Sequence, residues 1–409
     1  MIEAVQYLVV GGGLEGLAIA WSLADRGETD ILVLERGSLC SGMTGKSSAV
    51  IRCHYGNPSL AAMAWYGVEF FERAPELFGD DIGFRQCGYV VGVGDNDVEA
   101  LKANVAMQQE VGVAVEFLGH DAVAELWPGA HLEDFAAFAY EPRGGRGEAY
   151  STGMAFAAAA RTLGVQIRQY TPVASLLAHT DGPVYGAALA DGSEIHAGNV
   201  VLATGPWAPA LGATVGIDIP VRTQRAQVVL VDQGRPTPAV PVLSDLVGLQ
   251  YICREPNGDL LVGNSDHSKP QFVDPDGYPN RADDDAIETV VTKLGHRLPS
   301  MPDPRLSSSY GGGYDVTPDY NPIIGPAPRE GLFLATGFSG HGLRSLPRWA
   351  GSPPICSSTE KPISRTSPRR ISDTPGSPRA SYSPALTPTP APARCDDRHP
   401  NSPRPEADV

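Results

Sequence analysis

The sequence lacks the marks of a metalloprotein, a secreted protein or a membrane protein. No apolar run approaches the roughly 18 residues that a membrane-spanning helix needs, and no basic segment precedes an apolar run at the start. The cysteines show no C-x-x-C spacing, so we expect reduced thiols and no bound metal. The six cysteines are Cys40, Cys53, Cys87, Cys253, Cys356 and Cys395. These absences predict a cytoplasmic protein that binds no membrane.

Positive charge is also scarce. The chain has 31 lysines and arginines against 47 aspartates and glutamates, which gives a formal net charge of −16 at pH 7. A surface that binds nucleic acid gathers positive charge against the phosphate backbone. We therefore expect no nucleic-acid partner.

The rest of the composition is that of a globular chain, except at one end. With 409 residues, of which 42% are hydrophobic and 19% charged, the chain exceeds one ordinary domain, and we expect two interlocked domains. Residues 345–409 differ, because they hold 14 of the 37 prolines and five Ser-Pro pairs, with 9 basic against 6 acidic residues. Such a segment cannot bury enough apolar surface to offset its ordering entropy. We expect this Pro/Ser-rich tail to be disordered.

Glycine is abundant, and its most informative cluster lies near the start. The apolar strand Tyr7-Leu8-Val9-Val10 runs into Gly11, Gly13 and Gly16 and then into a helix-like segment. Gly11 permits a tight turn, Gly13 lets the backbone approach phosphates, and Gly16 lets the helix pack on the strand. A second apolar strand ends at Glu35, where a carboxylate can accept ribose hydroxyls, and the helix N-terminus offers N–H groups to a pyrophosphate. The pattern predicts an adenine dinucleotide and by itself leaves NAD and FAD open.

Between this motif and the tail, helical and strand patterns alternate without an internal repeat. The helical patterns cover residues 60–78, 97–110, 151–163 and 284–298, and the strand patterns cover 165–170, 199–205, 228–231, 249–253 and 260–263. The last three strands follow one another without helices, which predicts an antiparallel sheet on the substrate side.

The predicted fold class is therefore α/β. A Rossmann-like dinucleotide-binding domain, with a parallel sheet flanked by helices, is interleaved with an antiparallel-sheet substrate domain. We assign residues 1–84, 145–215 and 311–344 to the first domain, 85–144 and 216–310 to the second, and 345–409 to the tail.

Five segments together resemble one enzyme family. They are the glycine loop with Glu35, Ser47-Ser48-Ala49-Val50-Ile51-Arg52, Ala203-Thr204-Gly205-Pro206-Trp207, Tyr314-Asp315-Val316-Thr317-Pro318-Asp319 and Gly337-Phe338-Ser339-Gly340-His341-Gly342. In content and order they resemble the FAD-dependent amino-acid oxidoreductases of the D-amino-acid oxidase superfamily, especially the sarcosine oxidase and dimethylglycine dehydrogenase branch. The resemblance spans Tyr7 to Arg344 and implies FAD as the cofactor.

The resemblance also implies which residues hold the cofactor. Thr44, Ser47 and Ser48 would supply hydroxyls and backbone N–H groups to the pyrophosphate, although their residue types alone fit an ordinary polar loop equally well. Val173 matches the position whose backbone meets the adenine in the family. The full implied set is Gly11, Gly13, Leu14, Glu15, Gly16, Glu35, Arg36, Thr44, Ser47, Ser48, Val173, Ala203, Gly205, Trp207, Gly340 and Gly342.

Four further residues are implied on the substrate side. Arg52 and Arg344 match the two basic residues that clamp the substrate carboxylate in the family, where the second is more often lysine. A guanidinium can meet a carboxylate with two parallel hydrogen bonds. Tyr251 matches the aromatic residue that closes the substrate pocket, and by residue type alone it is equally a half-buried strand tyrosine. His341 is either a donor at the pyrimidine edge of the flavin or a structural histidine.

The reaction implied by the resemblance is hydride transfer to flavin N5 from the carbon next to the amine nitrogen of a small amino acid or N-methylated amino acid. The imine is then hydrolysed, and oxygen or another acceptor takes the electrons. The flavin carries the chemistry, so no Ser-His-Asp or Cys-His arrangement is required. Relatives that use oxygen well have a lysine at the position of Leu261, so a dehydrogenase fits as well as an oxidase. In that branch, a cysteine binds the flavin covalently. Its position corresponds to a glycine near Gly312 in this chain, so we expect FAD to be bound non-covalently.

A larger departure follows Gly342. The family continues there with a small-residue helix beneath the flavin, whereas here Arg344 opens the tail, which suggests a reading-frame error. Two alternatives to an active enzyme therefore stay open: an impaired flavoprotein without its terminal helix, and an interaction protein that acts through the Ser-Pro-rich tail. A homo- or hetero-oligomer is compatible with either.

Overall fold

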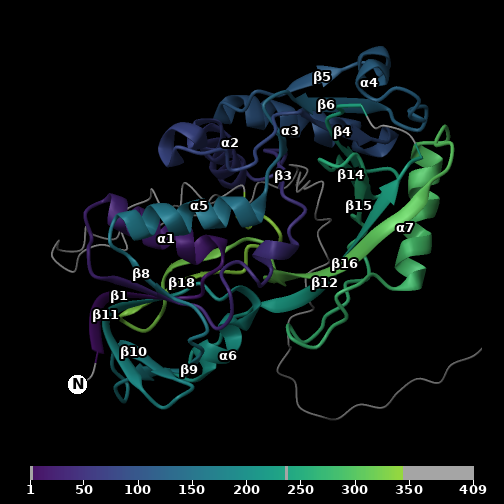
Figure 1. Ribbon diagram of the computed structural model, residues 1–409. Helices are drawn as coiled ribbons and strands as arrows, with labels where there is room; N and C mark the ends of the chain where they lie inside the picture. Colours follow the sequence, from purple (N-terminus) through teal and green to yellow (C-terminus); the bar gives the residue numbers. More distant parts are fainter. Residues whose placement is uncertain (1–2, 235–237, 344–409) are drawn as a thin grey trace, which may run out of the picture.

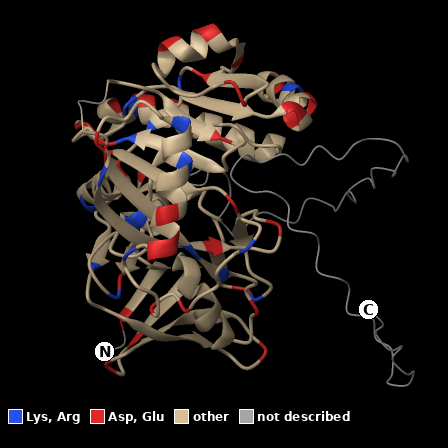
Figure 2. Cartoon of the chain, turned by 90° about the vertical axis from the view of Figure 1, so that its right-hand side faces the viewer, with Lys and Arg blue, Asp and Glu red and all other residues tan. Residues whose placement is uncertain are grey.

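Two eight-stranded sheets organise the chain in the computed structural model, which describes residues 3–234 and 238–343 (Figure 1). Seen from the side in Figure 2, the two sheets lie one above the other along the long dimension of the molecule, and acidic and basic residues occur on the elements of both. The predicted residue Arg344 and the predicted tail at 345–409 lie outside the described residues.

The first sheet is mainly parallel and contains the start of the chain. Its order is β17-β18-β11-β1-β2-β8, with β10 and β9 added beside β11. The strands are β1 (Glu3–Val10), β2 (Ile31–Leu34), β8 (Gln166–Arg168), β9 (Val173–Ala178), β10 (Val184–Leu189), β11 (Glu194–Leu202), β17 (Ile323–Pro326) and β18 (Leu332–Thr336). β1 pairs in parallel with β2 and β11, and β11 pairs in parallel with β18. All residues of β2 are buried, as expected for a strand inside a covered parallel sheet.

Helices cover this sheet and begin where the sequence changes its pattern. α1 (Leu14–Asp25) starts directly after Gly13 and packs side by side with α5 (Ala149–Thr162) above the sheet (Figure 1). The short α6 (Ala208–Ala213) follows the η3 turn (Gly205–Trp207) and contacts β9.

The second sheet is antiparallel except for one pair of strands. Its order is β16-β12-β15-β14-β13-β4-β6-β5. The strands are β4 (Tyr89–Val93), β5 (Glu116–Leu118), β6 (Ala137–Glu141), β12 (Arg222–Asp232), β13 (Val242–Asp245), β14 (Gln250–Arg254), β15 (Leu260–Asn264) and β16 (Arg305–Val316). The exception is the parallel pair of β4 with β13. A small two-stranded sheet pairs β3 (Val50–Ile51) with β7 (Gly145–Arg146).

Four further helices accompany the second sheet. They are α2 (Pro58–Phe78), α3 (Val98–Val111), α4 (His120–Leu126) and α7 (Asp284–Arg297), and two 3-10 turns, η1 (Thr44–Lys46) and η2 (Asp95–Asp97), complete the elements. α2 shows why such helices form at these positions. The side chain of Asn57 accepts a hydrogen bond from the backbone N–H of Ser59 at 2.8 Å, and Gly79 ends the helix with a φ of +70°.

The α/β architecture predicted from the sequence is confirmed. The predicted helices begin within two residues of the observed ones, and the predicted strands are all present. The strand predicted at 228–231 extends to Arg222–Asp232, because its outer residues are stabilised by pairing with β16 rather than by an apolar pattern of their own.

The chain passes repeatedly between the two sheets. β1 and β2 lie in the first sheet, β4 to β6 in the second, β8 to β11 in the first, β12 to β16 in the second, and β17 and β18 in the first. This order supports the predicted domain boundaries, which we retain as a proposal with one adjustment. β16 belongs to the second sheet over its whole length, so the boundary set between residues 310 and 311 falls inside a strand.

A buried ionic cluster joins α7 to the second sheet. Arg297 is fully buried at the end of α7, and its Nε donates to Asp245 Oδ2 in β13 at 2.9 Å. Its two terminal nitrogens donate to the carboxylate of Asp134 at 2.7 and 3.0 Å, and the ring of Phe135 lies 3.9 Å from Cζ. Such a cluster is tolerated in a core only when hydrogen bonds satisfy its charged groups, as they do for Arg297 and the two carboxylates here.

Within residues 3–234 and 238–343, no helix combines the length and the apolar character that crossing a bilayer requires.

Candidate functional site

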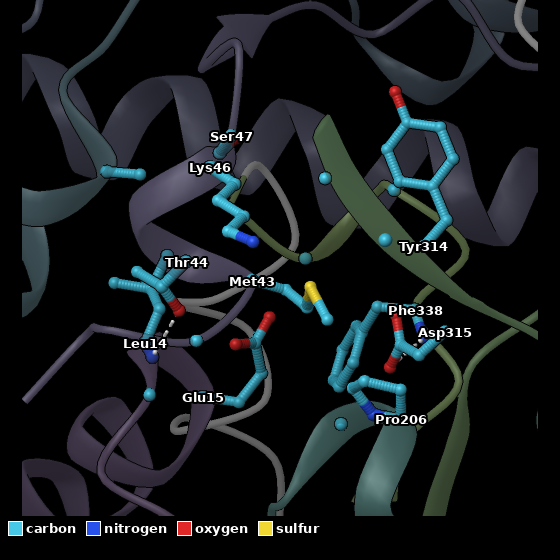
Figure 3. Close-up of a pocket in the computed structure, with 18 of the residues that line it drawn as sticks. Leu14, Glu15, Met43, Thr44, Lys46, Ser47, Pro206, Tyr314, Asp315 and Phe338 are labelled. Carbon is cyan, nitrogen blue, oxygen red and sulfur yellow. Dashed lines mark hydrogen bonds between the residues drawn. The ribbon is translucent and has the colours of Figure 1, made fainter. Parts of the chain in front are cut away.

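One cavity of about 690 Å³ is lined by residues of both sheets and the loops between them. Most of the residues predicted from the sequence meet there. These are Gly11, Gly13, Leu14, Glu15, Glu35, Arg36, Thr44, Ser47, Ser48, Arg52, Val173, Ala203, Gly205, Trp207, Tyr251, Gly340, His341 and Gly342. Gly16 lies behind the glycine loop rather than in the cavity wall. Figure 3 shows part of this wall.

The glycine loop is closed by backbone contacts that exclude larger residues. Gly11 has a φ of +113°, and a Cβ there would lie 2.4 Å from the backbone oxygen of Ala203. A Cβ on Gly16 would lie 2.0 Å from the backbone oxygen of Gly11. Beyond the loop, the backbone N–H of Leu14 donates to Thr44 Oγ1 at 3.1 Å (Figure 3). The helix N-terminus therefore faces the cavity, where its N–H groups favour an anion.

Glu35 is fixed at the end of β2 by the same loop. Its carboxylate accepts hydrogen bonds from the backbone N–H groups of Gly12 at 2.7 Å and Gly37 at 2.8 Å. A carboxylate has about four acceptor positions, so two remain for hydroxyl groups of a ligand. Val173 also lines the cavity.

A loop from the second sheet crosses to the first at residues 274–278, and we call it the crossing loop. The carboxylate of Asp276 accepts two hydrogen bonds from Arg36, at 2.6 and 3.1 Å, and one from Trp207 Nε1 at 2.9 Å. The guanidinium of Arg36 also lies 4.1 Å above the ring of Trp207. The crossing loop thus ties the two sheets together at the cavity.

Sequence reasoning missed several residues of the cavity wall. Lys46 extends into the cavity in Figure 3, and its Nζ donates to the hydroxyl of Tyr278 at 3.3 Å. Burial lowers the pKa of Lys46. Its place between the predicted Thr44 and Ser47 was a usable signal in the sequence. Tyr278 and its neighbours in the crossing loop offered none, because only the tertiary fold brings that loop to the first sheet.

Two acidic side chains in the cavity wall have raised pKa values. Asp315 accepts hydrogen bonds from the backbone N–H groups of Gly337 at 2.8 Å and Phe338 at 3.1 Å, and burial raises its pKa to about 6. Burial and the nearby charge of Asp315 raise the pKa of Glu15 to about 8. A Cβ on Gly342 would lie 2.0 Å from Glu15 Oε1, so the glycine makes room for this carboxyl. At neutral pH, Glu15 is therefore mostly protonated.

Arg52 provides a buried positive charge in the wall. It is 3% exposed, its Nη1 donates to the backbone oxygen of His54 at 2.5 Å, and its Cζ lies 4.7 Å from the ring of Tyr55 and 5.7 Å from that of Tyr89. Burial lowers the pKa of Arg52, but the two tyrosines and Glu141 outweigh this effect, so the pKa lies above its usual value. The buried Nη2 has no hydrogen-bond partner within the described ranges. That nitrogen is a donor available to a ligand.

Tyr251 and His341 lie in the same cavity. Tyr251 faces Gly263 on the neighbouring strand, where a Cβ would lie 2.1 Å from the tyrosine Cζ. Burial and the neighbouring Tyr314 raise the pKa of Tyr251 well above its usual value, so its hydroxyl stays protonated. His341 is buried, and its ring packs edge-on against Tyr55 with the ring centroids 5.0 Å apart.

The sequence departs from the family pattern at Leu261 and Gly312, and only the second of these residues lines the cavity. Leu261 is 3% exposed inside β15 and does not belong to the cavity wall. Gly312 does line the cavity, and a Cβ there would lie 3.4 Å from the Cβ of Lys46.

A comparison with protein families agrees with this arrangement. The family model described as FAD dependent oxidoreductase, DAO, matches residues 6–350. The chain belongs to this family. FAD is therefore its cofactor, as the sequence predicted.

Comparisons with curated proteins and solved structures identify individual relatives of this FAD-dependent oxidoreductase. It is 29% identical over 361 residues to 4-methylaminobutanoate oxidase (formaldehyde-forming) of Paenarthrobacter nicotinovorans, which covers 84% of this chain but only 42% of that protein. It is 27% identical over 353 residues to sarcosine oxidase subunit beta of Arthrobacter sp, covering 84% of this chain and 85% of that subunit. L-proline dehydrogenase from P. horikoshii superposes with a TM-score of 0.78 at 25% identity, covering 86% and 92% of the two chains. The predicted sarcosine oxidase-like branch is confirmed.

The residues of the cavity fit FAD. The glycine loop and the N-terminus of α1 suit a pyrophosphate, and Glu35 keeps acceptor positions for ribose hydroxyls. Thr204 Oγ1 is buried in the wall without a hydrogen-bond partner among the residues described, so it is a further polar group that a bound cofactor can satisfy.

Replacing Gly16 by alanine is expected to remove most of the bound FAD. The added Cβ would lie 2.0 Å from the backbone oxygen of Gly11, so the glycine loop, which we expect to hold the pyrophosphate, must move. The ratio of flavin to protein absorbance in the purified variant measures this loss. Gly119→Ala is the matched control, because a Cβ there meets no atom within 4 Å. Full FAD content in Gly16→Ala would contradict the prediction.

FAD is expected to bind less tightly as the pH rises through about 8. Glu15 has a pKa raised to about 8, so it is neutral below this pH and adds a negative charge above it, in the first turn of the helix that we expect to hold the cofactor phosphates. For one linked proton, the dissociation constant of FAD rises by at most about tenfold per pH unit above the pKa. Equilibrium dialysis of the holoprotein across this pH range measures the slope. Glu15→Gln should remove it, and Glu110→Gln, which changes an exposed glutamate, should not.

Proposed function

We propose that this FAD-dependent oxidoreductase oxidises the C–N bond of a small amino acid or N-methylated amino acid. The observation that carries the proposal is Arg52, a buried charged side chain in the FAD cavity whose Nη2 has no partner in the part of the chain that is described. A guanidinium in such a place favours a carboxylate, which can take two parallel hydrogen bonds from it. The relatives reported above are named for amino acids or N-methylated amino acids, which supports this class of substrate.

The side chains of the cavity have distinct roles in this proposal. FAD, when bound, supplies the hydride acceptor. Arg52 holds the substrate carboxylate, and the protonated hydroxyl of Tyr251 is a further hydrogen-bond donor in the cavity wall. The rings of Tyr55 and Tyr89 flank the guanidinium and keep water from it. Orientation of the substrate by these groups, rather than acid–base catalysis by a triad, is the contribution of the protein.

The electron acceptor in this proposal is oxygen or another oxidant. Leu261 is buried outside the cavity wall and offers no cation, whereas Lys46 places a cation in the wall from a different loop. Comparing re-oxidation of the reduced enzyme in air and with an artificial acceptor distinguishes an oxidase from a dehydrogenase.

The visible spectrum of the purified protein tests the proposed function. Flavin bands that bleach on anaerobic addition of sarcosine, dimethylglycine, proline or a D-amino acid would support it and identify the substrate. Bands that persist with all of these compounds would contradict the proposed substrate class. A colourless protein that takes up no added FAD would favour the impaired flavoprotein.

A further inference from the structure

Helix α3 buries two amides on the face where an amphipathic helix normally buries apolar side chains. The buried residues of α3 are Leu101, Asn104, Val105 and Gln108, which follow the helical spacing of three and four. A buried amide is costly unless its polar atoms find hydrogen-bond partners. The partners of these two amides therefore indicate why they are present.

Both amides meet the same imidazole. Gln108 Nε2 lies 3.2 Å from Nδ1 of His54, and Asn104 Nδ2 lies 3.4 Å from Nε2 of the same ring. Burial and the charge of Arg52 lower the pKa of His54 to about 3, so the ring is neutral. One ring nitrogen then donates and the other accepts, and a side-chain amide can serve either. The imidazole is held at both ends by α3.

The backbone of this histidine holds the arginine of the proposed substrate site. The backbone oxygen of His54 accepts the 2.5 Å hydrogen bond from Arg52 Nη1. On the other side, the backbone N–H of Cys53 donates to Glu141 Oε2 in β6 at 2.6 Å. The segment from Arg52 to His54 is therefore fixed from α3 and from β6, and all three of its residues are almost fully buried.

We propose that Asn104 and Gln108 are positioning residues for the substrate carboxylate. They fix the ring of His54. The backbone carbonyl group of His54 in turn orients Arg52, so that Nη2 of the arginine is available to the substrate. The inference rests on the proposed function, because it assigns these amides to the binding of the same carboxylate. Small errors in the placement of a binding group weaken the oriented complex strongly, which gives this support a function beyond packing.

The experiment uses the FAD-loaded enzyme and compares Gln108→Leu and Asn104→Leu with Gln109→Leu. Gln109 is the matched control, because it is the next residue of α3, lies on the exposed face and donates to the backbone oxygen of Val115. Acetate is the probe, and the change it causes in the flavin spectrum gives its dissociation constant. We expect each of the two buried variants to raise the acetate dissociation constant and the substrate KM about tenfold, with kcat and FAD content nearly unchanged.

A double-mutant cycle with Arg52→Lys separates positioning from general destabilisation. If the amides act through Arg52, adding Gln108→Leu to Arg52→Lys weakens acetate binding far less than it does in the wild type. Additive effects, an equal loss in Gln109→Leu, or unchanged acetate affinity in both buried variants would overturn the inference. If Arg52→Lys itself leaves acetate binding unchanged, the proposed function fails instead. Asn104→Leu keeps the test available where Gln108→Leu does not fold.

Discussion

Methionine in place of Arg52 is expected to raise the KM for substrate by about 100-fold and to leave FAD bound. The side chain is buried, charged and has a terminal nitrogen available to a ligand. Removing one partner of a buried, hydrogen-bonded charge pair costs about 2–5 kcal/mol, and about 1.4 kcal/mol corresponds to a factor of ten in affinity. Steady-state kinetics with the substrate found in the spectral screen measures the change.

Two further variants test whether the rise in KM is specific to the guanidinium of Arg52. Arg52→Lys keeps the charge but loses the planar fork, so its KM should lie between those of the wild type and Arg52→Met. Arg36→Met removes an arginine from the same cavity, where it pairs with Asp276 rather than facing a free position. At saturating FAD, Arg36→Met should leave KM unchanged. A KM in Arg52→Met within threefold of the wild type would exclude Arg52 as the carboxylate-binding residue.

Replacing Arg297 by methionine is expected to lower the free energy of unfolding by about 3–5 kcal/mol. The substitution removes the guanidinium from between two carboxylates, and the carboxylate of Asp245 is then buried without its cation. The helix end at α7 also loses its hydrogen bonds to Asp134. Denaturant unfolding of the holoprotein, followed by circular dichroism, measures the loss.

Arg305→Met is the matched control for this stability effect. Arg305 pairs with Asp303 on the surface, where both side chains are more than half exposed. An exposed ion pair is screened by water and contributes little to stability, so the control should unfold almost like the wild type. If the two variants unfolded at the same denaturant concentration, the buried cluster would not be the link that holds α7 to the sheet.

Much of the fold followed from local patterns in the sequence. The apolar run at Leu8 and Val9, the glycines after it and the carboxylate at Glu35 act within one βαβ unit, so their meaning is readable over a few tens of residues. Helix α2 was readable in the same way from its apolar spacing, which predicted residues 60–78 against the observed Pro58–Phe78.

The parts of the site that were not predicted depend on contacts between distant segments. Asp276 meets Arg36 across 240 positions of the sequence, and Gln108 meets His54 across 54. Nothing along the chain shows which residue meets which in either pair. The parallel pairing of β4 with β13 is of the same kind, because the residues of each strand say nothing about its partner until the fold places the two side by side. For Asn104 and Gln108, a signal existed in the amides on an apolar helical face.

The interleaving of the two sheets constrains how the chain can be made. β1 spans residues 3–10, its partner β11 spans 194–202, and the next strand, β18, ends at Thr336. In the second sheet, β12 likewise cannot pair with β16 until the chain has been synthesised to Val316. Pairings of such high contact order form slowly, and strand edges left open in the meantime invite aggregation. Neither sheet can therefore be completed on the ribosome before most of the chain has been synthesised. Slower synthesis at low temperature should favour recovery of the folded protein.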